Sequence, residues 1–284
     1  MRKRIRLSLQ RLIGNFFDGI FSSYLHAPHG LELDELRRYQ PGDDFRSIDW
    51  KTTARTGKLH VRIKLVDKRV TIFFLVDRSR SEKFGSLVNT KEDIQSSVLS
   101  LLVYAASETG NEIGFVTFTD KVESYIQPKA GAKEALKNIK IILLKTPSSN
   151  YTDLNTAFRF LNEQSHFPSL VFILSDFLAP YNYKQSLKTL SYYHEVIPII
   201  ISDRMETNLP DAKGFLSVQD IETGIIKSLD ISTALEKSAP YLALFRKLNI
   251  DYLTLSTGED EEIWIKKISE FFDKRIRRGG RRRR

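Results

Sequence analysis

The sequence predicts an α/β protein with a doubly wound, mainly parallel sheet, and two observations support this prediction. Residues 71–76 (TIFFLV) and 169–175 (SLVFILS) are almost unbroken apolar runs, as expected for strands that are buried on both faces. Around them, apolar residues recur at helical spacing over segments of ten or more residues. Strands that alternate with helices of this length favour a parallel sheet covered by helices on both sides.

The other elements follow in order along the chain. Thr90 is the expected N-cap of a first helix, which Gly110 ends. Pro198 lacks a backbone donor, which favours a place near an edge of the sheet for its strand. Further strands are predicted over residues 113–118, 122–126 (as a short hairpin partner), 196–201 and 251–255. Further helices are predicted over residues 132–143, 154–161, 182–194, 233–248 and 260–276.

Charge and composition divide the chain into four segments. The formal net charge is +9, but thirteen of the 44 basic side chains lie in residues 1–11 and 274–284. The remainder holds 31 basic against 35 acidic side chains, so the α/β domain itself is not basic. The expected segments are a basic amphipathic helix (1–25), a charged segment (26–66), the α/β domain (67–273) and a flexible Arg-rich tail (274–284).

The N-terminal helix has two interpretations. Apolar residues recur at helical spacing from Ile5 to Tyr24, and the polar residues that interrupt them argue against a secretory signal. The helix either packs on the α/β domain or lies on a membrane surface with its basic end at anionic lipid. No run of 18 apolar residues predicts a membrane-spanning helix. We therefore expect a cytoplasmic protein, with peripheral contact at the inner face of the membrane as the alternative.

Composition and motifs exclude several kinds of site. Without cysteine there are no disulfides, iron–sulfur clusters, thiolate zinc sites or cysteine nucleophiles. The sequence also has no Walker A, G-x-G-x-x-G, G-x-S-x-G or H-E-x-x-H pattern, and its five histidines are scattered. These observations favour a protein that is not an enzyme.

Oxygen-bearing side chains follow two of the predicted strands. Asp77, Ser79 and Ser81 form a D-x-S-x-S pattern after the strand at 71–76, and an oxygen-only donor set suits Mg²⁺. Thr152, before a helix, and Asp176, after a strand, can complete the site because ligands bind at the carboxyl ends of parallel strands. The alternative is ordinary turn and cap chemistry, which favours the same residue types.

These loops resemble the metal-ion-dependent adhesion site of von Willebrand factor type A domains. Glu35–Arg62 (ELRRYQPGDDFRSIDWKTTARTGKLHVR) closely resembles the signature of a bacterial family labelled domain of unknown function 58, whose members carry a von Willebrand factor type A-like domain. Ser202–Gly224 is similar to that family's downstream segment, so the resemblance covers roughly residues 30–275. It implies association with a MoxR-type AAA+ ATPase in chaperone-like assembly or maturation of other proteins. No catalytic activity is established for the family.

The resemblance also implies roles for the metal-site residues. The serines would touch the cation, the aspartates would often act through water, and an open position would receive a partner's carboxylate. The positions that match are Asp77, Ser79, Ser81, Thr152 and Asp176.

The sequence departs from the family pattern around these positions. Glu82 stands where methionine is frequent, and Tyr151 stands where glycine is common. Arg78 and Arg80 place two positive charges beside the predicted cation. Pointing outward, the arginines would recruit an acidic partner; folded inward, they would replace the metal by pairing with the two aspartates.

The PGDDFRSIDWK segment is expected to be a charged clamp. Pro41-Gly42-Asp43 is a strong turn signal. The segment either fixes these arms to the sheet domain or forms the docking face for the ATPase, with Trp50 as an anchor in the core or at that face. Ion pairs are predicted from Asp44 and Asp49 to Arg37, Arg46, Lys51 or Arg55.

We therefore expect a non-enzymatic, metal-dependent interaction module that engages an acidic residue of a client protein. The Arg-rich tail suggests an alternative function, binding to an anionic surface or nucleic acid, because six arginines lie in the last eight residues. Nucleic acid is the less favoured partner, since no aromatic residues are interleaved there. A second alternative is a magnesium-dependent hydrolase, which would need a general base that the sequence does not reveal.

Overall fold

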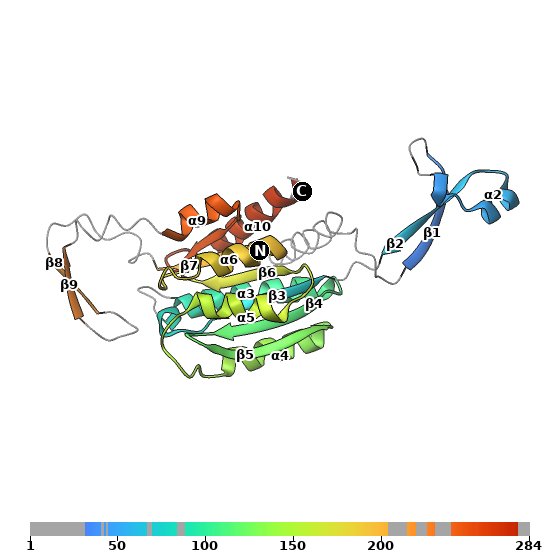
Figure 1. Cartoon of the computed structure of the whole chain (residues 1–284). Coiled ribbons are helices and arrows are strands. Elements are labelled where there is room, and N and C mark those ends of the chain that lie inside the picture. Colours follow the sequence, from blue (N-terminus) through green and yellow to red (C-terminus); the bar gives the residue numbers. More distant parts are fainter. Residues whose placement is uncertain are drawn as a thin grey trace.

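The two apolar runs form neighbouring strands at the centre of a six-stranded sheet (Figure 1). β3 (Thr71–Asp77) and β6 (Leu170–Ser175) pair in parallel. The strand order is β10-β7-β6-β3-β4-β5, and only β5 is antiparallel to its neighbour. The other strands are β4 (Glu112–Phe118), β5 (Val122–Ala130), β7 (Glu195–Ser202) and β10 (Leu253–Ser256).

This computed structural model describes residues 32–40, 43, 45–66, 70–83, 89–203, 215–219, 226–230 and 240–277. The helix predicted over residues 1–25 and the end of the Arg-rich tail lie outside the described residues. None of the described helices has a stretch long and apolar enough to cross a bilayer.

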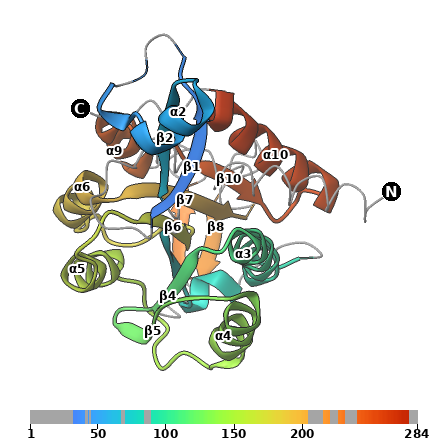
Figure 2. The same ribbon diagram turned by 90° about the vertical axis from the view of Figure 1, so that its right-hand side faces the viewer.

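Helices cover both faces of the sheet, which confirms the doubly wound prediction (Figure 2). On one face, α3 (Lys91–Glu108), α4 (Ala132–Leu144) and α10 (Glu261–Arg277) enclose a core around Phe74 and Phe172. On the other, α5 (Leu154–Gln164), α6 (Lys184–Tyr193) and α9 (Pro240–Leu248) enclose a second core around Phe73 and Val171. Successive residues of a strand face opposite sides, so each apolar run serves both cores.

β7 lies one strand in from the edge, beside β10, which agrees with the predicted place near an edge. One boundary differs from the prediction. Helix α10 continues to Arg277, so residues 274–277 belong to the α/β domain and the tail starts later than predicted. They are held there because Arg275 forms ion pairs with Glu195 and Asp251.

The charged segment forms a separate small unit. β1 (Glu32–Arg38) and β2 (His60–Val66) make an antiparallel hairpin with η1 (Phe45–Ser47) and α2 (Trp50–Thr56) in its connection. Only four residues separate β2 from β3, so the hairpin joins the domain at the amino end of β3. Figure 1 shows it standing beyond that end of the sheet. A second hairpin, β8 (Phe215–Gln219) with β9 (Ile226–Asp230), falls partly within the family-like stretch 202–224.

Candidate functional site

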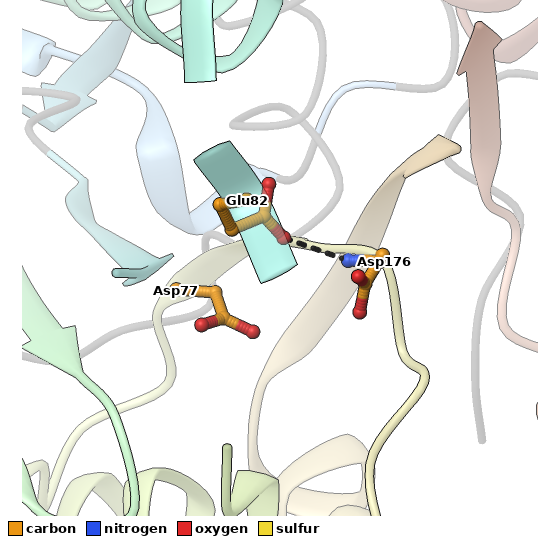
Figure 3. Close-up of side chains that lie close together, drawn as sticks. All are labelled: Asp77, Glu82 and Asp176. Atoms are coloured by element: carbon orange, nitrogen blue, oxygen red, sulfur yellow. Dashed lines mark hydrogen bonds between the residues drawn. The ribbon is translucent and has the colours of Figure 1, made fainter. Parts of the chain in front are cut away.

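Three buried carboxyl groups meet at the carboxyl ends of β3 and β6 (Figure 3). Asp77 ends β3, Asp176 directly follows β6, and Glu82 lies in the short helix η2 (Arg80–Lys83). One carboxylate oxygen of each lies within 4.8 Å of the others. Asp77 and Asp176 come together because neighbouring parallel strands end at the same edge of the sheet.

Hydrogen bonds hold each carboxyl group in place. Asp77 accepts from the backbone N–H of Ser79 at 2.9 Å and from the hydroxyl of Ser175 at 2.7 Å. Glu82 Oε1 accepts from the backbone N–H of Asp176 at 3.1 Å, the dashed contact in Figure 3. Glu82 Oε2 is buried and has no hydrogen-bond partner in the described part of the chain. One buried carboxylate oxygen is therefore still available to a ligand.

The backbone is strained at Phe177, the residue after Asp176. Phe177 has a φ of 57°, a left-handed conformation that is costly for a bulky residue. Its N–H donates to Ser175 Oγ at 3.1 Å, and its ring packs against Tyr183 and Phe245. The preceding residue, Asp176, donates its own N–H to Glu82.

A lysine reaches the acidic cluster from helix α3. Lys91 Nζ lies 2.8 Å from Asp176 Oδ2, and the two side chains are 0% and 1% exposed. The other oxygen of Asp176 accepts from the backbone N–H of Leu178 at 2.9 Å. With all groups ionised, three carboxylates and one ammonium leave two negative charges uncompensated. That imbalance is costly in a buried site.

The electrostatics of the site follow from this charge. Burial, with the neighbouring Asp176 charge, raises the pKa of Asp77 to about 7. Burial, with the charges of Asp176 and Asp77, also raises the pKa of Glu82 well above its usual value. Without another cation, the cluster therefore reduces its negative charge by taking up protons.

The other predicted ligands lie in the loops around the carboxyl groups. The hydroxyl oxygens of Ser79 and Ser81 are 3.0 Å apart. Thr152 is buried. Its loop contacts the Asp77 loop, because the Arg80 backbone N–H donates to the Asn150 carbonyl oxygen at 3.1 Å. The structure thus brings together the three loops that the sequence singled out.

Arg78 takes up neither of the predicted arrangements. Its guanidinium is buried and turned away from the aspartates, toward Glu92 at 2.9 Å and the Leu143 carbonyl at 3.2 Å. Arg80 is exposed. The cation that pairs with Asp176 is Lys91, which the sequence-based prediction missed.

Sequence reasoning also left Glu82 out of the ligand set. Lys91 carried a usable signal, because it lies three and seven residues before Ile94 and Val98 on the buried stripe of α3. A charged residue on a buried helix face needs a buried partner of opposite charge. For Glu82, the only signal in the sequence was its departure from the family pattern.

The donor set fits a hard divalent cation. Every candidate ligand offers oxygen, which Mg²⁺ prefers, and Glu82 has an oxygen without a partner in the described residues. The two uncompensated negative charges also equal the charge of one divalent ion. The residues that would hold it are Asp77, Ser79, Ser81, Glu82 and Asp176, and Thr152 lies in the loop beside them.

The charged segment contains an ion pair whose acceptor differs from the predicted ones. Arg37 makes a bidentate ion pair with Asp43, at 2.7 and 2.8 Å, and so holds the pKa of Asp43 below its usual range. The predicted acceptors of Arg37 were Asp44, which lies outside the described residues, and Asp49, which caps α2 by accepting from the Thr52 N–H at 2.7 Å. Arg37 therefore pairs with the aspartate of the turn.

The other residues that the sequence singled out in this segment are exposed. Trp50 is 67% exposed at the start of α2, so it anchors no core. Arg46 is exposed in η1, and Lys51 and Arg55 are exposed on α2. The segment thus presents an aromatic ring beside several basic side chains.

Comparison of the sequence with known proteins identifies a family. Residues 35–239 match the model described as "Protein of unknown function DUF58". The uncharacterized protein Rv1480 of Mycobacterium tuberculosis is 28% identical over 288 residues, 95% of this chain and 88% of that protein. Among solved structures, BatB of Bacteroides thetaiotaomicron has a TM-score of 0.50 at 11% identity, covering 74% of this chain and 99% of that chain. A von Willebrand factor type A structure from Catenulispora acidiphila has a TM-score of 0.40 at 10% identity, covering 76% and 44%.

At such low identity, the likeness to BatB concerns the fold alone. The parallel sheet with helices on both faces agrees with the predicted von Willebrand factor type A-like fold. Because the family model spans most of its length, the chain belongs to the DUF58 family of proteins of unknown function.

Proposed function

We propose that this protein is a metal-dependent protein-interaction module rather than an enzyme. The observation that carries the proposal is the cluster of Asp77, Glu82 and Asp176, buried within 4.8 Å of one another at the carboxyl edge of the sheet. Together with Ser79 and Ser81, these residues would hold Mg²⁺. When bound, the ion would supply a concentrated positive charge with an open position for a partner's carboxylate.

Apolar side chains around the cluster support a protein partner. Tyr151, Leu178 and Tyr181 are 48%, 58% and 43% exposed on the loops beside Thr152 and Asp176. These two loops are joined because Asn182 donates to Asp153 at 3.2 Å. Exposed apolar groups that gather at one site are typical of an interaction surface. We therefore propose that the client segment has an acidic residue flanked by apolar ones.

We further propose a MoxR-type AAA+ ATPase as a second partner, in the cytoplasm, on the basis of the family resemblance. The β1–β2 hairpin is the candidate docking face, because Phe45 and Trp50 are 68% and 67% exposed there. Large exposed aromatic side chains are typical of protein interfaces. The ATPase would supply the energy for remodelling, since this sequence has no Walker A motif.

Calorimetric titration with Mg²⁺ tests the proposal. Wild type is expected to bind one ion, and Asp77→Asn to lose most of the heat because it removes a charged ligand. Asp120→Ala is the matched control, because Asp120 is an exposed carboxylate at the same edge of the sheet. Equal heats from wild type and Asp77→Asn would contradict the proposal.

A further inference from the structure

We propose that Lys91 is a built-in counter-cation that competes with the divalent ion for Asp176. The site would then exist in two forms, one in which Lys91 pairs with Asp176 and one in which the metal takes over that carboxylate. This inference rests on the proposed function, because it concerns the same cluster.

The position of Lys91 is built into helix α3. Thr90 caps the helix and forms a capping box with Asp93, which fixes the first turn and hence the Lys91 backbone. The side chain is wholly buried and ends 2.8 Å from Asp176 Oδ2. An ammonium group that is wholly buried needs such a partner, so the ion pair is a strong local preference.

The hydrogen bonds of Asp176 show why the two cations compete. Oδ2 accepts from Lys91, and Oδ1 accepts from the Leu178 N–H at 2.9 Å. Both oxygens are thus engaged, and a metal ligated by Asp176 would share an oxygen with a positively charged group. In a buried site, repulsion between like charges at this range is large, because little water screens it.

The same lysine stabilises the protein when no divalent ion is bound. Three buried carboxyl groups lie within 4.8 Å of one another, and Lys91 compensates one of them. Lys91 therefore allows the site to fold without metal. It also raises the Mg²⁺ concentration that is needed to fill the site. It acts as a positioning and regulatory residue of the site, not as a ligand.

The test compares Lys91→Met with wild type by Mg²⁺ calorimetry and by thermal unfolding with and without Mg²⁺. The variant is expected to bind Mg²⁺ at least about tenfold more tightly. Without Mg²⁺ the variant should also have a lower Tm than wild type. Addition of Mg²⁺ should raise the Tm of the variant more than that of wild type. Lys267→Met is the control, because Lys267 pairs with Glu259, which follows β10, three strands away from β3 in the sheet. Lys91→Arg, which keeps the charge, should bind Mg²⁺ no better than wild type.

The outcomes separate this inference from the proposed function. Equal Mg²⁺ affinity in folded Lys91→Met and wild type overturns the role of Lys91 and leaves the metal site standing. Binding by Lys91→Met alone supports the role of Lys91 and contradicts metal dependence of the wild type. Binding by neither overturns both. If Lys91→Met does not fold, Lys91→Gln takes its place, since its amide can still donate to Asp176.

Discussion

Two residues, Glu82 and Lys91, determine what the edge of the sheet can hold. Asp77 and Asp176 alone would form a site that serines and water complete. Glu82 adds a third carboxyl group with an unpartnered oxygen, and Lys91 adds a fixed positive charge 2.8 Å from Asp176. Neither effect is local in sequence. Helical spacing marks Lys91 as buried, but its pairing with Asp176 and the role of Glu82 depend on how charges gather in a buried volume, which the sequence alone does not show.

A buried histidine, remote from the site, makes stability depend on pH. Burial lowers the pKa of His194 to about 4 from 6.5, and neither ring nitrogen has a hydrogen-bond partner among the described residues. Between pH 6.5 and 4, His194 binds more protons in the unfolded chain than in the folded protein. The contribution of His194 to the free energy of unfolding should therefore fall, by up to about 3 kcal/mol, as the pH is lowered through this range, while the raised pKa values of Asp77 and Glu82 act in the opposite direction.

Urea denaturation at pH 7 and pH 4.5 measures this effect. The change in the free energy of unfolding from pH 7 to pH 4.5 should be less unfavourable to the folded protein in His194→Leu than in wild type. It should be unchanged in His166→Gln, because His166 is exposed. The same pH dependence in all three proteins would show that His194 is not the group responsible.

At the scale of elements, the central strands were predictable from the sequence, and the start of the C-terminal tail was less so. Burial on both faces leaves nearly unbroken apolar runs, so β3 and β6 were located to within a residue or two. Because parallel neighbours end at one edge, the approach of Asp77 and Asp176 was predictable as well. The helix predicted over residues 260–276 likewise ends within one residue of α10. The start of the tail was not predicted, because Arg275 joins the domain through ion pairs with residues far away in sequence.

The end of α10 carries a prediction about truncation. A chain that ends at Arg277 should unfold with the free energy of the full chain, within about 0.5 kcal/mol, because surface changes usually cost little. A chain that ends at Asp273 loses Arg275, whose guanidinium is shared by Glu195 and Asp251 and is 11% exposed. Its free energy of unfolding should fall by about 2–4 kcal/mol. Urea denaturation measures both, and equal stability of the two truncated chains would restore the boundary at residue 274.

At the scale of the whole molecule, the two candidate interaction surfaces lie at opposite ends of β3. The hairpin joins the amino end, and the carboxyl cluster lies at the other. A seven-residue strand spans roughly 20 Å, about two Debye lengths at physiological salt. Charges on one surface should therefore have little influence on the other.

This separation predicts that the two binding functions can be removed one at a time. Trp50→Ala should weaken binding of a purified MoxR-type ATPase at least about tenfold if Trp50 is an interface anchor. It should change the Mg²⁺ affinity by less than twofold. Surface plasmon resonance and calorimetry measure the two effects. A parallel loss of both would mean that the surfaces are coupled.

The most direct measurement of the central claim is a crystal structure of the wild-type protein grown with Mn²⁺ as an anomalous stand-in for Mg²⁺. We predict a single strong anomalous peak among the carboxylate oxygens of Asp77, Glu82 and Asp176, with Lys91 drawn away from Asp176. Density that shows Lys91 still seated on Asp176, with no peak at saturating Mn²⁺, would contradict the account.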